Sequence, residues 1–331
     1  MAHQSTTPIG VLVTNVGTPD APTPHALRNF LAEFLADKKV IDYPRWFWLP
    51  LLHGIILRVR PRKSAHMYQR IWTEDGSPLL KITENIASSL EQSLSSQLDI
   101  PVTVRIGMRY GQPSIEAALQ SFQEQGIDQI LVLPLFPQYS QTTTETTIDA
   151  VHAEIHQWGK QPELRWVHDY HDHPKYIEAL AQFIRTEKTN GNKLLFSYHG
   201  VPQRYTRNGD PYLEQCIHTS ELLANELGLS EDEWSYAFQS RFGPEEWLQP
   251  YTDETLVSLG ESNLGGVSVL CPGFAADCLE TIDEIGNEGQ HTYIEAGGKA
   301  FQYIPALNDS ADHIEALTHV AIHHLGDWLE N

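Results

Sequence analysis

Short apolar runs alternate with helix-like segments along almost the whole chain, and this alternation limits the folds that are available to it. The runs are rich in branched and aromatic residues and begin at Ile9, Val102, Asp128, Glu163, Lys193, Glu233 and Gly266. Continuous apolar runs are typical of strands buried on both faces, and strands that alternate with helices form right-handed, doubly wound parallel sheets. The sequence therefore predicts an α/β protein.

The alternation runs through the 331 residues twice. Helical segments between the strands include residues 113–126, 211–228 and 251–263. A chain of this length is too long for one small core, and about 150 residues per domain is expected. We predict two Rossmann-like halves, residues 1–170 and 171–304, with a C-terminal helix within residues 305–331 that packs back on the first half.

Charge and cysteine content exclude several classes of protein. The net charge of −21 argues against a nucleic-acid partner, because no strong basic field is available to displace counterions. Three cysteines without a CxxC pair indicate reduced thiols and a cytoplasmic protein. No secretory signal is visible at the N-terminus. The most apolar segment, residues 46–57, is shorter than the roughly 18 residues of a membrane span, so it could lie on a membrane but not cross it.

The common motifs of this architecture are missing. No GxGxxG follows a predicted strand, and neither GxxxxGK[ST] nor GxSxG occurs. The first two carry dinucleotide and nucleotide phosphates, and the third carries the nucleophile of α/β-hydrolases. The sequence therefore gives no support for dinucleotide binding, for nucleotide binding by a P-loop or for α/β-hydrolase catalysis.

Two predicted strands end in residues that can do chemistry. His199 ends the strand that begins at Lys193, and in doubly wound sheets ligands bind beyond the carboxyl ends of the strands. After the strand at Gly266 we expect a helix at residues 275–286, in which Asp277, Glu280 and Glu284 share one face. A structural histidine and a solvated acidic face are the simpler interpretations. Facing each other, the same groups could bind a divalent metal or accept protons.

At these residues the chain closely resembles the ferrochelatases. The resemblance is carried by "LLFSYHGVP" from Leu194, "YAFQSRFGPEEWLQPYTDETL" from Tyr236 and "LCPGFAADCLETIDEI" from Leu270. It is supported by "VTNVGTPDAPT", "RIGMRYGQPSIEAAL" and "PLFPQYSQTTT" in the first half. The resemblance implies insertion of Fe(II) into protoporphyrin IX with release of two protons, the last step of haem b biosynthesis. It also implies two Rossmann-like domains that face a central cleft, a chelatase-like fold.

The resemblance also implies site residues. The metal-binding and catalytic positions of the family fall on His199 and Glu280. From their place beside Glu280, we expect Asp277 and Glu284 to form a relay for protons or metal. The sequence does not decide whether His199 binds the metal or accepts a proton. Porphyrin contacts are expected from Val16, Arg109, Tyr110, Tyr139, Ser140, Arg241 and Trp247. An apolar lip at about residues 30–60 is expected to include Phe34, Trp46, Trp48 and Leu51.

Basic residues flank this lip and could pair with porphyrin propionates or anionic lipid: Arg45, Arg58, Arg60, Arg62 and Lys63. We therefore expect a cytoplasmic protein that contacts the inner face of the membrane through the lip.

Departures from the family pattern refine the expectation. Some relatives bind a [2Fe–2S] cluster through four cysteines, and three cysteines cannot supply it. We expect Fe(II) as substrate and no prosthetic group. Val16 lies where coproporphyrin-using relatives tend to carry a tyrosine, which favours protoporphyrin. Cys278 lies where several relatives have a second histidine, which puts a role for that position in doubt.

Two alternatives remain open: another tetrapyrrole chelatase, acting on coproporphyrin or inserting cobalt or nickel, and a non-enzymatic haem or porphyrin carrier. A histidine-rich stretch, "HDYHDHP" at residues 168–174, could hold a metal on its way to the site or bind metal only adventitiously.

Overall fold

The computed structural model describes residues 7–187, 189, 191–262 and 265–329. These residues form two compact units, each built on one four-stranded parallel sheet. The first unit comprises Met1–Leu135, Gln141–Asp169 and Ile314–Asn331, and the second comprises Phe136–Ser140 and Tyr170–His313. The predicted α/β class with two parallel sheets is confirmed.

The sheet of the first unit has the strand order β2-β1-β3-β4. Its strands are β1 (Ile9–Thr18), β2 (Val102–Gly111), β3 (Gln129–Pro134) and β4 (Glu163–Trp166). Leu12 of β1 packs with Ile130 and Val132 of β3 against Leu119 and Phe122 of a neighbouring helix. Burying each such side chain stabilises the fold by about 1.5–3 kcal/mol, which explains why β1 is apolar throughout.

The first unit also contains helices. They are α1 (Pro24–Ala36), α2 (Arg45–Leu51), α3 (Leu57–Ile71), α4 (Pro78–Gln97), α5 (Ile115–Glu124), α6 (Thr144–Ile155) and α12 (Ala311–Leu325). Ser114 caps α5, because its Oγ accepts the N–H of Ala117 at 3.1 Å. Thr318 of α12 donates to Oγ of Ser93 in α4 at 2.9 Å, so the C-terminal helix lies against the first unit.

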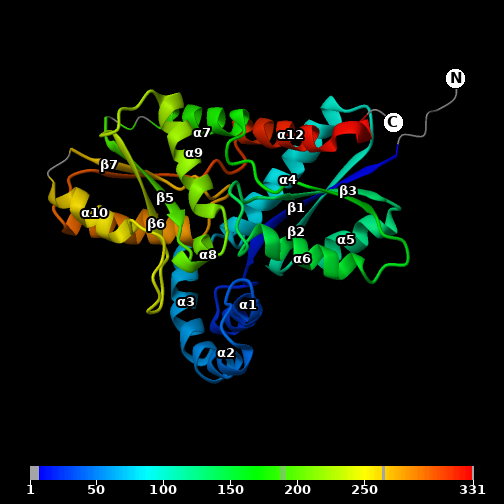
Figure 1. Ribbon diagram of the computed structural model, residues 1–331, viewed down its shortest axis with the longest axis horizontal. Helices are drawn as coiled ribbons and strands as arrows, with labels where there is room; N and C mark the ends of the chain where they lie inside the picture. Colours follow the sequence, from blue (N-terminus) through cyan, green and yellow to red (C-terminus); the bar gives the residue numbers. More distant parts are fainter. Residues whose placement is uncertain (1–6, 188, 190, 263–264, 330–331) are drawn as a thin grey trace. The chain divides into compact units, whose positions relative to one another are not determined.

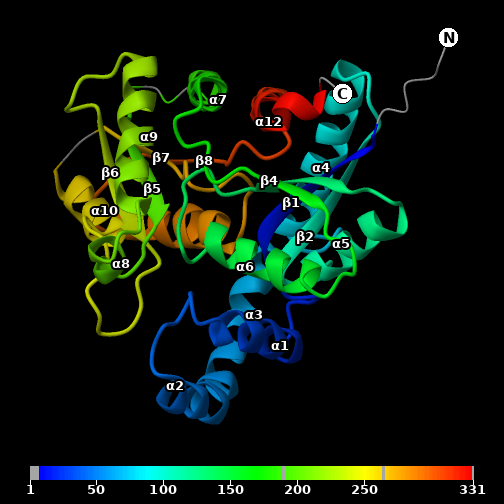
Figure 2. The same cartoon turned by 45° about the vertical axis from the view of Figure 1, so that its right-hand side comes forward.

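The apolar segment folds as a group of helices within the first unit. A π-helix (Leu52–Ile56) joins α2 to α3, and both views draw α1, α2 and α3 together (Figures 1 and 2). Trp48 is buried, and its indole N–H donates to the carbonyl of Leu35 at 2.7 Å. On the outside, Trp46 is 80% exposed and Val59 is 68% exposed. Within the described residues, no helix combines the length and the apolar character that crossing a membrane requires.

The sheet of the second unit has the order β6-β5-β7-β8. Its strands are β5 (Lys193–His199), β6 (Trp234–Gln239), β7 (Val267–Leu270) and β8 (Phe301–Ile304). Its helices are α7 (Pro174–Thr186), α8 (Gln203–Arg207), α9 (Tyr212–Leu227), α10 (Thr252–Glu261), a π-helix (Glu280–Gly289) and α11 (Gln290–Glu295). The sequence did not single out β8, which has only four residues.

The two faces of this sheet carry different helices. Tyr198 of β5 bonds to Ser220 of α9 at 2.8 Å, so α9 covers the face to which Tyr198 points. Leu195 packs with Leu256 of α10 and Ile285 of the π-helix on the other face. Figure 1 draws α9 and α10 on opposite sides of these strands. Side chains alternate along a strand, so His199 shares the face of Leu195 and lies on the side of the π-helix.

The predicted helix at residues 275–286 is wrong at both ends. The helix begins at Glu280 and continues through Gly286 and Gly289 into α11. Neither glycine has a positive φ, so neither ends the helix. A Cβ on Gly286 would lie 3.5 Å from the Tyr303 ring, an ordinary van der Waals distance, so the helix passes β8 here without a close contact that requires glycine. Asp277 precedes the helix, and its predicted place on one helical face with Glu280 and Glu284 is therefore also wrong.

Candidate active site

The chain turns immediately after His199, at Gly200, where the end of β5 lies against the end of β6. Gly200 donates its N–H to the carbonyl of Gln239 at 2.8 Å. A Cβ on Gly200 would lie 2.8 Å from that same oxygen, which only glycine avoids. His199 is half-buried at the end of β5, and its Cα pairs with that of Gln239 in β6.

The orientation of the imidazole fixes its tautomer. Nδ1 of His199 lies 2.6 Å from the carbonyl oxygen of Gly200. A carbonyl only accepts hydrogen bonds, so Nδ1 carries the proton and the neutral ring keeps its lone pair on Nε2. This arrangement is the one that orients histidines for metal binding or proton acceptance.

Gln239 connects the strand ends to the π-helix. Its Oε1 accepts a hydrogen bond from Ser197 at 2.8 Å, and its Nε2 donates to the backbone carbonyl of Glu280 at 2.7 Å. Gln239 and Ser197 are buried. The first turn of the π-helix is therefore held at a defined place next to β5 and β6.

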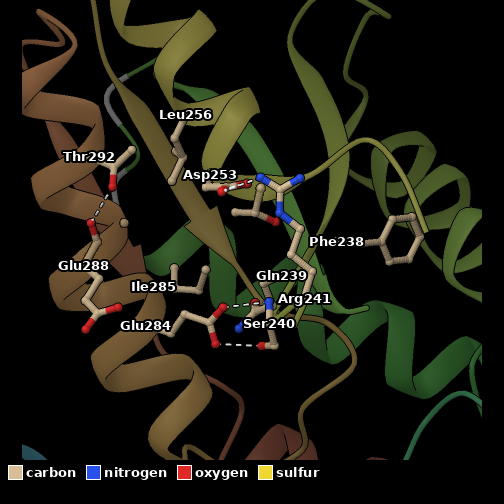
Figure 3. A pocket seen from close by; sticks show the side chains of 12 residues that line it. Phe238, Gln239, Ser240, Arg241, Asp253, Leu256, Glu284, Ile285, Glu288 and Thr292 are labelled. Carbon is tan, nitrogen blue, oxygen red and sulfur yellow. Dashed lines mark hydrogen bonds and ion pairs between the residues drawn. The ribbon is translucent and has the colours of Figure 1, made fainter. Parts of the chain in front are cut away.

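Glu284 lies one turn further along the π-helix and points at Ser240 (Figure 3). Its Oε1 accepts the backbone N–H of Ser240 at 2.7 Å, and its Oε2 accepts the Ser240 hydroxyl at 2.6 Å. Burial raises the pKa of Glu284, and Ser240 and His199 oppose this rise while Glu280 adds to it. His199 and Glu280 are thus each near enough to Glu284 to affect its pKa.

A pocket of about 260 Å³ opens beside Glu284 in the second unit. Its walls include Arg241, Asp253, Leu256, Glu284 and Glu288 (Figure 3). Arg241 is paired with Asp253 and Glu254, each at 2.9 Å, and stacks over the Tyr251 ring. Because acidic groups outnumber the arginine, the pocket suits cations better than anions.

Asp277 is buried and serves the surrounding chain. One oxygen accepts hydrogen bonds from Tyr303, from Thr281 at 2.9 Å and from the N–H of Ala306 at 3.2 Å. The other accepts Nδ2 of Asn308 at 2.8 Å. These bonds favour a positioning role for Asp277 over the predicted relay. Cys278 is also buried, and burial followed by the nearby Glu280 raises the pKa of its thiol.

The other predicted residues of the second unit make internal contacts. Trp247 is buried, and its indole N–H donates to the carbonyl of Phe242 at 3.0 Å. Ser140 donates to Asp210 at 2.9 Å, and the N–H of Tyr139 donates to Gln215 at 2.6 Å. Their predicted contacts with a porphyrin stay predictions.

In the first unit, Arg109 and Tyr110 converge on one carboxylate. Oδ2 of Asp37 accepts Arg109 at 2.5 Å and the Tyr110 hydroxyl at 2.9 Å. Burial is the main reason that the pKa of Tyr110 is raised. Val16 packs at the edge of the cluster that contains Phe30, Leu52 and Tyr110. Of the four predicted lip residues only Trp46 is exposed, while Phe34 and Leu51 are half-buried and Trp48 is buried.

Sequence reasoning missed Gln239 and Ser240. Both lie at the carboxyl end of β6, next to β5, within the motif "AFQSRFG". The strand-end rule that singled out His199 would have found them had it been applied to this neighbouring strand.

Two solved structures with a similar fold are a sirohydrochlorin chelatase and a terminal enzyme of sirohaem biosynthesis. SirB from Bacillus subtilis, solved with Fe3+, has a TM-score of 0.58 at 10% identity and covers 96% of each chain. CbiX, the terminal enzyme for sirohaem biosynthesis in denitrifying bacteria, has a TM-score of 0.52 at 14% identity and covers 96% of this chain and 100% of its own. The fold is therefore chelatase-like.

The sequence identifies the family within this class. The ferrochelatase family model matches residues 8–325. The ferrochelatase of Thioalkalivibrio sulfidiphilus is 52% identical over 99% of this chain and 90% of its own length, and that of Alcanivorax borkumensis is 48% identical over 99% and 97%. The chain belongs to the ferrochelatase family. The predicted family is confirmed, as is an enzyme of the lyase class that inserts metal into a porphyrin, and the alternative functions are not favoured.

Proposed function

We propose that His199, Glu280 and Glu284 form the metal and proton site for insertion of Fe(II) into protoporphyrin IX, the step that yields protohaem. The supporting observation is that His199 lies opposite Gln239 at the ends of β5 and β6, while Gln239 and Ser240 bind the Glu280 carbonyl and the Glu284 carboxylate of the π-helix. The pKa of Glu284 responds to both His199 and Glu280. Because the Gly200 carbonyl holds the proton of His199 on Nδ1, Nε2 is the nitrogen that can bind a metal or accept a proton.

The reaction needs a metal ligand and two proton acceptors. Fe(II) replaces two pyrrole N–H protons, so two protons must leave the macrocycle for each iron that enters. A neutral imidazole is a suitable ligand for Fe(II), and it is equally suited to accept a proton. Because the raised pKa of Glu284 brings it closer to neutral pH, this carboxylate is suited to take up and release the second proton.

The acidic pocket supplies a route for cations. Glu288 follows Glu284 after four residues, which is about one turn of the π-helix, and both line the pocket. We infer that protons leave along these carboxylates, or that iron arrives there. Asp277 supports this arrangement by holding the segment that precedes the helix.

We propose porphyrin contacts in each unit separately. In the first unit these are Val16, Arg109 and Tyr110, and in the second unit Tyr139, Ser140, Arg241 and Trp247. Arg109 and Arg241 are the candidates for the propionates. Their present partners Asp37 and Asp253 would compete for them, so each interaction requires an exchange of partners.

We propose that the apolar lip rests on the cytoplasmic surface of the membrane. Trp46, Phe47, Ile55 and Val59 are exposed, and basic residues of α2 and α3 flank them. Apolar side chains in the headgroup region together with basic residues near anionic lipid are the usual components of peripheral binding. Fe(II) is a substrate in this proposal, and no prosthetic group or [2Fe–2S] cluster takes part.

An anaerobic assay with Fe(II) and protoporphyrin IX tests the proposal. We expect the wild-type protein to consume the fluorescent free porphyrin. His199→Ala should lose about 10²-fold or more of the rate, which is typical for removal of an acid–base group. His291→Ala, an exposed histidine paired with Glu295 on α11, is the matched control and should be unchanged.

Two results would overturn the assignment. Undiminished metallation by His199→Ala would exclude His199 from the chemistry. Tight binding of haem by the wild-type protein without consumption of porphyrin would instead indicate a carrier.

A further inference from the structure

Two histidines and an aspartate meet on the second unit outside the site described above. His171 and Asp172 lie in the connection between β4 and α7, and His218 lies on α9. One donor atom from each of the three residues lies within 4.8 Å of the other two. His171 is half-buried, and the other two residues are exposed.

The spacing of the two imidazoles matches a shared metal ion. Nδ1 of His218 lies 3.3 Å from Nε2 of His171. Two nitrogens bound at about 2.0–2.1 Å to a tetrahedral ion are separated by about 3.3–3.4 Å. A hydrogen bond between the rings is the alternative, but 3.3 Å is longer than the usual N–H···acceptor distance of about 2.9–3.0 Å.

The backbone holds the two histidines in this position. The carbonyl of His171 accepts the hydroxyl of Thr219, the residue after His218, at 3.0 Å. Thr219 is buried and also accepts Nε2 of Gln138 at 3.0 Å. On the other side of His171, the buried Tyr170 donates its N–H to the carbonyl of Pro137 at 2.9 Å. The β4–α7 connection is therefore hydrogen-bonded to α9 next to the imidazoles of His171 and His218.

We propose that His171, Asp172 and His218 bind a divalent first-row transition metal. Two imidazoles and one carboxylate are a donor set for such ions, and three protein ligands leave one tetrahedral position for water. The Asp172 side chain is exposed and can rotate toward the ion. Bound metal would join the β4–α7 connection to α9 and stabilise the second unit, because the ion binds only when both parts are in place.

This site is separate from the proposed catalytic cluster. α9 covers the face of the sheet to which Tyr198 points, whereas the π-helix with Glu280 and Glu284 covers the opposite face. The metal site therefore does not depend on the proposed function, and its loss should leave porphyrin metallation unchanged.

Calorimetric titration of the 331-residue chain with Zn2+ or Co2+ tests the site. In a His199→Ala background, which removes the histidine of the catalytic cluster, we expect one bound ion per chain. Adding His218→Ala or His171→Ala should weaken that binding about tenfold or more, since each removes one of three protein ligands. Asp172→Asn, which keeps the size of the side chain, should weaken it less.

Thermal melting gives a second test of the site. Zn2+ should raise the melting temperature of the protein with the three residues intact and have a smaller effect on the His218→Ala variant.

His291→Ala is the matched control, because His291 is an exposed histidine beside a carboxylate in the same unit. The proposal is overturned if His171→Ala and His218→Ala bind the ion as tightly as their parent, or if His291→Ala weakens binding as much as they do. His218 is exposed on its helix, so His218→Ala should fold even if His171→Ala does not. Retention of wild-type metallation by His218→Ala in an otherwise native chain confirms that the fold is intact.

Discussion

Ser240 donates both its backbone N–H and its hydroxyl to the two carboxylate oxygens of Glu284, at 2.7 and 2.6 Å. Ser240 adopts φ 67°, a left-handed conformation that is uncommon for residues other than glycine. The strained backbone points both donors at one carboxylate, and they stabilise its charged form against the effect of burial.

Replacing Ser240 with alanine should shift the pH dependence of metallation. Loss of the hydroxyl bond raises the pKa of Glu284 further, because this bond lowers it in the native site. Glu284 must be unprotonated to accept a proton, so the acid limb of kcat/KM should move to higher pH. On that limb the rate should fall about tenfold, since a hydrogen bond to a charged group contributes about 1.5–3 kcal/mol. A pH profile that coincides with that of the wild type would contradict this role.

Ser240→Gly separates the hydroxyl from the backbone strain. Glycine lacks the same hydroxyl but adopts a positive φ without a steric penalty. Its pH profile should therefore shift as in Ser240→Ala, while its melting temperature should be higher than that of the alanine variant. Equal stability of the two variants would show that the backbone conformation at this position carries no strain.

The raised pKa of Glu284 should also make the free energy of unfolding depend on pH. Burial raises the folded-state pKa of Glu284 above its ordinary value of 4.5, so the folded state holds this proton more tightly than the unfolded chain. The resulting stabilisation is fully present below pH 4.5 and is lost as the pH rises through the raised pKa. Glu284→Gln removes the titration, so its free energy of unfolding relative to wild type should increase from pH 4 to pH 7 in urea denaturation. Glu221→Gln, exposed on α9, should show no such trend.

Gln239→Leu should affect both stability and catalysis. The change removes the hydrogen bonds that Gln239 makes with the Glu280 carbonyl and the Ser197 hydroxyl. Their loss should lower the free energy of unfolding by about 1–3 kcal/mol. Because the π-helix loses its anchor, kcat for metallation should fall as well. Gln302→Leu is the matched control, since Gln302 likewise joins a backbone carbonyl (Glu187) to a serine hydroxyl (Ser268). It should lose similar stability and keep its kcat; an equal loss of kcat would mean that both changes act only through stability.

The exposed part of the lip should govern binding to lipid. Trp46→Ala combined with Phe47→Ala should reduce partitioning onto vesicles of anionic lipid about tenfold or more, because burial of large aromatic side chains drives such binding. Metallation of porphyrin in detergent should change little. Ile294→Ser removes an equally apolar exposed side chain from α11 and is expected to bind vesicles like the wild type. Unaltered vesicle binding by the double variant would exclude the lip as the contact.

Much of the fold could be predicted from sequence because buried strands are continuous and apolar. The first seven strands begin within two residues of the expected positions, and β5 ends at His199 as expected. The position of His199 at the carboxyl end of β5 already indicates which edge of the sheet holds the site. The face on which it lies depends on which helices pack there, and this follows only from the folded chain.

The π-helix could not be predicted in the same way. Gly286 suggests a helix end, but it has no positive φ and the helix continues through it and through Gly289 into α11. Asp277 has the spacing of a site residue, yet its hydrogen bonds come from Tyr303, Ala306 and Asn308, which only the folded chain brings near. The role of Ser240 depends on a positive φ that no local pattern of residues signals.

The cross-link made by Gln239 has a mechanical consequence. One amide side chain ties the ends of two strands to the first carbonyl of the π-helix. A shift of the end of β5 or β6 is therefore expected to displace the first turn of the π-helix with it.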